Sequence, residues 1–324
     1  MAVNSDGFFS YLYYSNEGGL MALQKLRLEK SITEASRTIV LTAGLIAVLF
    51  PVLWLLKTSF IENQETIINP INWLPKSFTL ENYLMPLTGR YENQVDGTIV
   101  INKSPAWPSV SPFIGLVING LIVSGAVTFL SIVLAIMTGY GFSRFQFFGR
   151  RSLMILVLNT QMFPYIAIVV PLYVMYRNLK MLNTYTGLII AMTGMVLPFS
   201  IWMIKSFCDT IDKDLEEAAY IDGASRFRIL WNIVVPVITP GIASVGMFAF
   251  LNSWNHLLYV MILNTRETLL TVPMGLLREY SSNYYTFYAT MSAGLLLIII
   301  PIAVIYIPFQ KYFASGLTAG AVKG

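Results

Sequence analysis

The sequence contains little charge and almost no histidine or cysteine. Only 12% of its 324 residues are charged, against roughly 25% in ordinary soluble domains. Its single histidine and single cysteine are too few for the usual His/Cys zinc cage or for an intrachain disulfide. A phosphate-binding loop needs a Gly-Lys pair, and the sequence has none. These absences argue against a zinc centre, a disulfide scaffold and a nucleotide site built by this chain.

Apolar residues take the place of the missing charge. Hydrophobic residues make up 56% of the chain, and the mean hydropathy is +0.64. A membrane helix needs about 20 mostly apolar residues. Six segments meet this requirement, at 38–56, 114–142, 153–176, 187–204, 233–255 and 291–309. We therefore expect an all-α polytopic membrane protein with six transmembrane helices.

The distribution of Lys and Arg predicts the orientation. Of the 21 basic residues, 13 lie before the first segment, in the second and fourth connections, or in the tail. The positive-inside rule then places both termini in the cytoplasm of a cell with this protein in its inner membrane. The expected organisation is a cytoplasmic segment 1–37 with an interfacial amphipathic helix, a transmembrane domain 38–310 and a cytoplasmic tail 311–324. Loops 57–113 and 256–290 would be external, and loop 205–232 cytoplasmic.

None of the six apolar segments contains Asp, Glu, Lys or Arg. Proton-coupled carriers keep such residues as relays despite their cost in the bilayer, so a proton-driven carrier is disfavoured. A sodium-driven carrier built from backbone carbonyls stays open. His256 has no carboxylate at recognisable spacing to orient it, which disfavours a Ser–His nucleophile and an enzyme. Any energy for transport would therefore come from a partner protein.

The loop 205–232 predicts a short helix with defined ends. Asp214 is the expected N-cap, and Glu217 three residues later completes a capping box. Gly223 suits a left-handed C-cap, and Ser225 can begin a second short helix.

Between these caps, Leu215, Ala218 and Ala219 form a small apolar face. Small side chains would let the groove of another protein approach the helix backbone closely. An amphipathic helix that rests on lipid explains the same pattern equally well.

The same loop resembles the EAA signature of binding-protein-dependent ABC importer permeases. The matching residues are Glu217-Ala218-Ala219, Asp222-Gly223-Ala224, Ile233 and Pro236. Val235 departs from the pattern, which usually has Leu there. The tail from Gly316 to Gly324 and the pair Trp254-Asn255 are similar to the smaller permease subunit of maltose-type sugar importers. The resemblance covers about residues 35–324.

The resemblance implies a type I ABC importer permease fold with a cytoplasmic coupling helix. The chain would form half of the pathway for a sugar or oligosaccharide, beside a second homologous permease, an ATPase dimer, an external solute-binding protein and membrane lipid, with no nucleic acid. ATP and Mg would bind the partner ATPase, and this chain would carry no cofactor. Closure of the ATPase pair would move the helix together with the third to fifth spans. The residues implied in ATPase coupling are Glu217, Ala218, Ala219, Asp222, Gly223, Ala224 and Pro236.

Polar or aromatic side chains inside the spans are candidates for lining a substrate pathway. Trp254 could stack on a sugar ring. Hydrogen bonds between helices explain the same side chains without any substrate. The candidates are Asn119, Asn159, Gln161, Ser200, Asn252, Trp254 and Asn255.

Other functions remain open at this level. An ABC permease for a non-sugar solute, a stand-alone carrier or channel, and a membrane scaffold are all compatible with six apolar spans. Maltodextrins, other oligosaccharides and uronate oligomers are not distinguished by any residue pattern.

Overall fold

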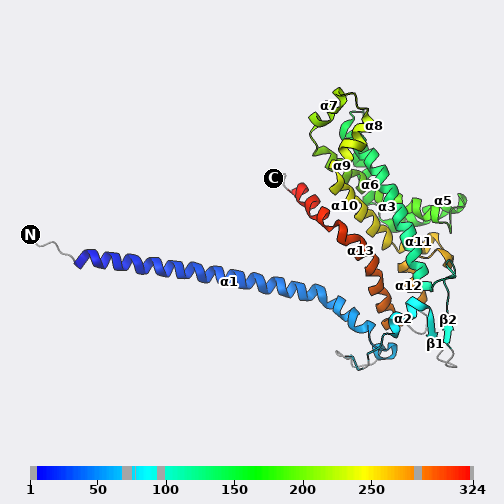
Figure 1. Cartoon of the computed structure of the whole chain (residues 1–324), viewed down its shortest axis with the longest axis horizontal. Coiled ribbons are helices and arrows are strands. Elements are labelled where there is room, and N and C mark those ends of the chain that lie inside the picture. The colour runs from blue at the N-terminus through cyan, green and yellow to red at the C-terminus, as the bar shows by residue number, and fades with distance from the viewer. Residues whose placement is uncertain (1–5, 68–74, 77, 93–98, 281–286, 322–324) are drawn as a thin grey trace, which may run out of the picture. The chain divides into compact units, whose positions relative to one another are not determined.

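The computed structural model describes residues 6–67, 75–76, 78–92, 99–280 and 287–321, and helices dominate them (Figure 1). The chain divides into two compact units, 1–57 and 58–324. The elements in chain order are α1 (Asp6–Ser59), η1 (Asn63–Ile67), α2 (Glu81–Thr88), β1 (Arg90–Glu92), β2 (Ile99–Ile101), α3 (Pro112–Arg144), α4 (Arg150–Asn159), η2 (Thr160–Met162), α5 (Tyr165–Asn178), α6 (Tyr185–Asp209), α7 (Lys213–Ile221), α8 (Arg226–Ile229), η3 (Leu230–Val234), α9 (Val235–Val237), α10 (Thr239–Trp254), α11 (Leu258–Leu263), η4 (Glu267–Leu269), α12 (Val272–Tyr280) and α13 (Tyr288–Ala321).

The first unit consists of most of α1, which is one continuous helix. The described part of the predicted cytoplasmic segment 1–37 and the predicted first span 38–56 both belong to it. Placement of a helix from segment 1–37 along the membrane surface stays a prediction. Within α1, the stretch Thr33–Ser59 is long and apolar enough to cross a bilayer.

Among the described residues, four helices have the length and apolarity of a membrane span. They are Thr33–Ser59 of α1, α3, α6 and Tyr288–Pro308 of α13. Two bent pairs raise the total to six if each pair is one span. This pattern agrees with the six predicted segments. It corrects the expectation of continuous helices at 153–176 and 233–255, because these are bent by 97° and 80°.

One of the two bends coincides with a residue that directly precedes a proline. Steric clash with a proline ring disfavours the helical conformation of the preceding residue. Phe163, before Pro164, is extended with ψ 130°, which separates η2 from α5. In the other pair the helix breaks at Ile238, two residues before Pro240, and α10 begins at Thr239.

Three long helices, α3, α6 and α10, pack together in the 58–324 unit (Figure 1). Small residues allow the backbones to approach closely. A Cβ on Gly139 of α3 would lie 2.9 Å from the backbone nitrogen of Lys205 in α6. Buried side chains form two clusters, a larger one and a second that we call the α7-side cluster. The α7-side cluster includes Ala135, Ile136, Tyr140, Ile201, Ile204, Cys208, Ile229, Leu230 and Val234.

The end of this unit that lies opposite α7 and α8 carries α2, α12 and a small hairpin (Figure 1). Strands β1 and β2 pair antiparallel, with Arg90 opposite Ile101. The all-α fold class is confirmed, and the predicted external loop 57–113 contains this short hairpin of two three-residue strands. Helix α13 runs from the α2 end toward the end that carries α7 (Figure 1).

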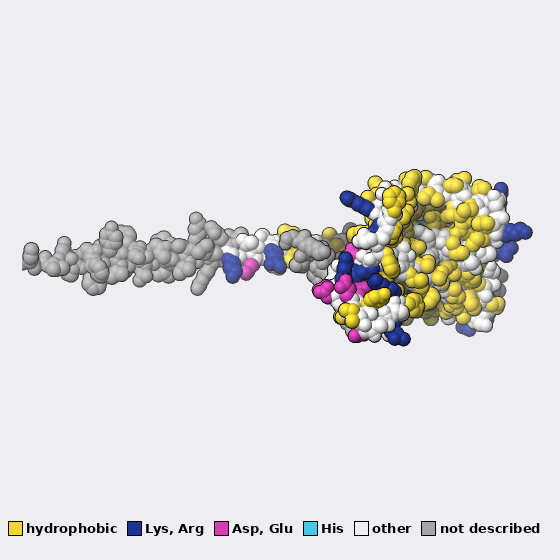
Figure 2. Space-filling view, turned by 90° about the horizontal axis from the view of Figure 1, so that it is seen from above, with side chains coloured by type: hydrophobic (Ala, Val, Ile, Leu, Met, Phe, Trp, Pro, Cys, Tyr) yellow, Lys and Arg dark blue, Asp and Glu magenta, His cyan; other side chains and the backbone are white. Residues whose placement is uncertain are grey.

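The surface of the 58–324 unit is strongly apolar. Figure 2 shows hydrophobic side chains over much of the visible face, with charged side chains gathered mainly in one region and along the edges. Large exposed side chains occur on several spans, including Phe129, Ile166, Ile299 and Val304. Such a surface suits contact with lipid or with other membrane subunits.

Some sequence predictions fall outside the described residues. In the predicted cytoplasmic tail 311–324, the last three residues are not described, and the side chains of 311–321 are not described either.

Candidate functional site

Helix α7 is the short helix predicted in the loop 205–232, but its cap differs from the prediction. The N-cap is Asp212, whose Oδ1 accepts a hydrogen bond from the backbone N–H of Asp214 at 3.2 Å. The prediction of Asp214 as the cap, with a capping box to Glu217, was wrong because the helix already begins at Lys213. Asp214 and Glu216 lie in the first turn, where negative charge favours the helix dipole.

The C-terminal end of α7 is a Schellman motif, as the glycine predicted. Gly223 has φ +83°, the left-handed conformation that favours glycine. Its N–H donates to the carbonyl of Tyr220, and the N–H of Ala224 donates to the carbonyl of Ala219. These two bonds satisfy carbonyls that a helix end otherwise leaves unpaired.

The chain then begins α8 at Ser225, again as predicted. The Ser225 hydroxyl accepts a hydrogen bond from the backbone N–H of Arg228 at 3.3 Å. Helix α8 continues through the π-helical turn η3 into α9, which contains the exposed Pro236. The predicted coupling loop is thus a helix, a tight turn and the start of the fifth span.

The outward surface of α7 and α8 is accessible and carries large apolar side chains among charged ones. Glu217, Ala218, Asp222 and Gly223 are exposed, while Ala219 and Ala224 are half-buried against the α7-side cluster. Of the predicted apolar face, Leu215 and Ala218 are exposed, but Ala219 packs against the interior. Other apolar residues, which the sequence did not single out, join the exposed surface. The large apolar side chains on this surface are Leu215 (49% exposed), Tyr220 (59%), Ile221 (85%) and Phe227 (66%).

Glu216 occupies the inner side of α7, and sequence reasoning missed it. Its Oε1 accepts a hydrogen bond from Arg144 Nε at 2.6 Å, and its Oε2 accepts one from Tyr140 Oη at 2.9 Å. The Arg144 and Glu216 side chains are 6% and 5% exposed. One feature of the sequence could have indicated this role. Two adjacent glutamates on a helix point about 100° apart, so they need not share the same exposed face.

A second polar group lies beside this ion pair. Ser143 Oγ donates to Asp209 Oδ1 at 2.6 Å, and Asp209 also pairs with Lys205 one helical turn earlier. Arg144 Nη1 donates to Ser143 Oγ at 3.0 Å. The ends of α3 and α6 and the beginning of α7 are therefore joined by one continuous set of polar contacts.

Three of the predicted pathway residues lie inside the protein. Asn119 is 1% exposed, and its Oδ1 accepts hydrogen bonds from Trp107 Nε1 at 2.9 Å and Tyr185 Oη at 2.6 Å. Ser200 is fully buried and bonds the carbonyl of Val196 in its own helix.

Trp254 is also buried, at 1% exposure. Its ring stacks on Phe250 with centroids 5.5 Å apart, and a Cβ on Gly120 would lie 3.0 Å from it. The indole fills the core between α3 and α10, so its accessible surface in this chain is very small.

The other four predicted pathway residues are accessible. Asn252 on α10 and Asn255, the C-cap of α10, are exposed, each with its amide bonded to a carbonyl one turn earlier. Gln161 is half-buried between the carbonyl of Met195 and Tyr165 Oη.

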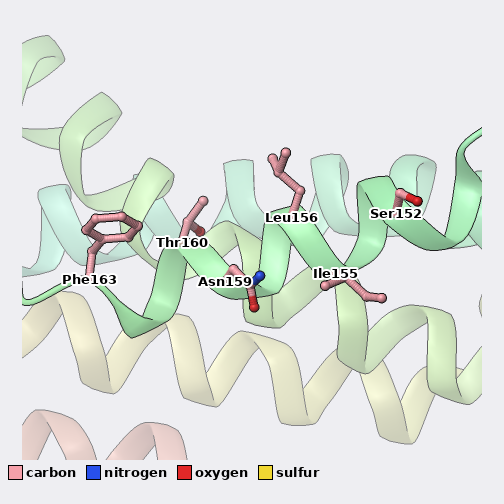
Figure 3. Close-up of a pocket in the computed structure, with 6 residues that line it drawn as sticks. All are labelled: Ser152, Ile155, Leu156, Asn159, Thr160 and Phe163. Carbon is pink, nitrogen blue, oxygen red and sulfur yellow. The ribbon is translucent and has the colours of Figure 1, made fainter.

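Asn159 lines a shallow open pocket of about 510 Å³ on α4 and η2. In Figure 3 its side chain points to the same side of the helix as Ile155, while Leu156 and Thr160 point the other way. The other lining residues are Ser152 and Phe163.

The only histidine has an aromatic environment. The His256 ring lies edge-on to Tyr259 and Tyr165, with centroids 4.6 and 6.4 Å away. Among the described residues, no group of three or more His, Cys, Asp or Glu side chains could hold a metal ion.

Comparison with known proteins gives one family match. Residues 131–318 match the model of the family described as "Binding-protein-dependent transport system inner membrane component". This stretch includes α7 and both bent helix pairs.

Curated relatives align over most of the chain. It is 32% identical over 276 residues to the sulfoquinovosyl glycerol transport system permease protein SmoH of Agrobacterium fabrum, covering 85% of this chain and 89% of that protein. It is also 32% identical over 276 residues to the trehalose/maltose transport system permease protein MalG of Thermococcus litoralis, covering 85% and 92%.

The fold is also found among solved structures. A chain in the crystal structure of a bacterial ABC transporter involved in the import of the acidic polysaccharide alginate superposes with a TM-score of 0.70. The match covers 87% of this chain and 96% of that chain at 19% sequence identity, so it bears on the fold alone.

Proposed function

The chain belongs to the family of binding-protein-dependent transport system inner membrane components, and on that premise we propose that it takes up a carbohydrate by coupling to a separate ATPase through α7. Members of this family are multi-pass membrane components of ABC importers and not enzymes. The proposal assigns this chain one half of the translocation pathway. A second, homologous permease would supply the other half.

The exposed surface of α7 is the observation that carries the ATPase assignment. Ala218 is exposed between the larger side chains of Leu215 and Ile221, so a partner groove can come close to the helix backbone there. Glu217 beside it offers a carboxylate to a basic or hydrogen-bonding group of the partner. We assign ATP and Mg to that partner ATPase.

The relatives supply the substrate class. SmoH and MalG are named for transport of sulfoquinovosyl glycerol and trehalose or maltose. Both cover more than four fifths of this chain, which supports a carbohydrate over other solutes. We place the sugar against the accessible polar residues Asn159, Gln161, Asn252 and Asn255.

The proposed orientation has both termini in the cytoplasm. Loop 145–149, α7 and α8 lie at one end of the 58–324 unit, and α13 runs toward that same end (Figure 1). Arg144, Arg150, Arg226 and Arg228 also belong to this end, in agreement with the positive-inside rule. The hairpin, α2 and α12 would then face an external solute-binding protein.

A pull-down of the tagged chain from its native membrane in mild detergent tests this proposal. Mass spectrometry is expected to recover an ATPase, a second permease and ATP hydrolysis in the same fraction. A solute-binding protein identified with them can then be screened against a panel of sugars. Recovery of the chain alone, or preference of the binding protein for amino acids or phosphate, would contradict it.

A further inference from the structure

Helix α7 is attached to the body of the protein by a charged side chain. Glu216 is its only buried residue, and its carboxylate bonds Arg144 and Tyr140, which both belong to the cytoplasmic end of α3. Ordinary surface helices are attached through an apolar stripe. Here the half-buried Ala219 is the only apolar contact of α7 with the α7-side cluster, and the one fully buried residue is a glutamate whose hydrogen bonds fix its direction.

Arg144 extends this contact to neighbouring elements. Its Nη2 donates to the carbonyl of Ile211, in the turn before α7, at 3.1 Å. Its Nη1 donates to Ser143, which bonds Asp209 at the end of α6. The guanidinium of this α3 residue therefore bonds directly to α7 and to the turn before it. It reaches α6 through the Ser143 hydroxyl.

This geometry favours a rigid connection over a merely stabilising one. A buried ion pair gains little net stability, because desolvation offsets most of its attraction. Its hydrogen bonds are short and fixed in direction. Loss of one partner leaves the other charge buried, so α7 cannot shift away from Arg144 without a large penalty.

The two adjacent glutamates of α7 lie on different faces of the helix. Glu217 is exposed and faces outward, whereas Glu216 is 4% exposed and faces α3. A force applied to the outer face would reach the body through the inner one.

We propose that Glu216 and Arg144 form a clamp that makes α7 move as one body with α3 and α6. This inference rests on the proposed function, since it presumes that an ATPase moves α7. It also changes the expected route of coupling. The resemblance implied that the third to fifth spans move with α7, while the clamp directs the movement into the second and fourth spans.

Spin labels on the purified complex of this chain with its ATPase and second permease test the clamp. Lys213→Cys on α7 and Phe129→Cys on α3 are both exposed, and the native Cys208 is buried. With Glu216 intact, the distance distribution between the labels is expected to stay unchanged when MgATP and vanadate trap the ATPase. With E216Q, the distribution is expected to shift or broaden on trapping.

A second readout concerns coupling. E216Q is expected to retain the ATPase in the complex but to lose about fivefold or more of the stimulation of ATP hydrolysis by the binding protein, the low end of ordinary allosteric coupling. E217Q should act in the opposite way, with weaker retention of the ATPase and an undisturbed distance in the remaining complex. Neither pattern follows from a loss of fold stability alone.

A second, more conservative variant can be used if E216Q does not insert into the membrane. Y140F removes one hydrogen bond and keeps the ring, and it should broaden the trapped distribution in the same direction. An unchanged distribution in E216Q, or in Y140F where E216Q is not recovered, overturns the clamp. Absence of an ATPase from the wild-type complex instead overturns the proposed function.

Discussion

Asn63 caps the N-terminus of α13 from 226 residues away, with its Oδ1 accepting the backbone N–H of Ala289 at 3.0 Å and that of Thr290 at 3.4 Å. The first N–H groups of a helix have no partner within the helix. The Asn63 amide also donates to Thr290 Oγ1 at 3.0 Å. The connection after α1 is thereby fixed to the start of the last span.

Removal of this cap is expected to destabilise the 58–324 unit. N63A should cost about 1–2 kcal/mol, the upper part of the range for helix caps, because the side chain's four hydrogen bonds, to Ala289, Thr290 and Asn82, are lost together. N63D keeps the accepting oxygen and adds a favourable charge at a helix N-terminus. Thermal unfolding in detergent should therefore rank wild type above N63D and N63D above N63A. Equal stability of N63A and wild type would show that the cap contributes nothing.

Two glycines near the end of α3 that contacts α7 should respond in opposite ways to alanine. A Cβ on Gly139 would lie 2.9 Å from Lys205 N and 3.0 Å from the carbonyl of Ile201, so G139A must separate α3 from α6. Such overpacking costs about 1–3 kcal/mol. A Cβ on Gly141 meets nothing within 4 Å, so G141A should be neutral or stabilise the helix by up to about 1 kcal/mol. Thermal unfolding of both variants checks the contrast.

Local rules in the sequence were sufficient for the ends of α7 and α8. Gly223 and Ser225 act through residues within five positions, and their roles were predicted correctly. The N-cap was misplaced by two residues because Asp212 and Asp214 are chemically equal candidates. The bends at Phe163 and Ile238 were missed because apolar composition measures length and not direction.

Contacts between distant residues could not be predicted from one sequence. Glu216 lies 72 residues from Arg144, and Asn119 lies 149 and 151 residues from the carbonyls that its amide binds. Asn119 and Trp254 were pathway candidates because they are polar or aromatic within apolar spans. Only the packing distinguishes a buried side chain from an accessible one of the same chemistry.

The pathway assignment can be tested with two residues that are close together on α10. W254A should lose about 3–5 kcal/mol of stability, since it removes a fully packed indole. N252A should change stability by less than about 0.5 kcal/mol, because an exposed side chain that bonds its own helix contributes little. Uptake assays should then show a higher half-saturating sugar concentration in N252A with normal protein levels. Unchanged uptake in N252A would remove Asn252 from the pathway.

Gly223 tests whether the tight turn after α7 matters for coupling. Its φ of +83° disfavours side chains, although a Cβ there would meet nothing within 4 Å. G223V should therefore cost roughly 1–2 kcal/mol through backbone strain alone, leaving the protein inserted but uncoupling ATP hydrolysis from transport. Asn tolerates this conformation, so G223N should retain coupling. Normal coupling in G223V, measured as transport per ATP hydrolysed, would be evidence against this role.

Ala218 separates docking of the ATPase from folding of this chain. The side chain is exposed on α7 and makes no part of either core cluster, so A218L should leave thermal stability within about 0.5 kcal/mol of wild type. A leucine would hold a partner groove away from the helix backbone, and co-purification of the ATPase should fall by about tenfold, which corresponds to 1.4 kcal/mol.

T210L supplies the matched control, since Thr210 is exposed near α7 but lies outside its cap. It should retain the ATPase at the wild-type level, because the added bulk lies at the C-cap of α6 and outside α7. If A218L retains the ATPase as well as T210L does, the partner does not approach α7 at Ala218. The larger side chains Leu215, Ile221 and Phe227 would then be the next residues to test as its contact surface.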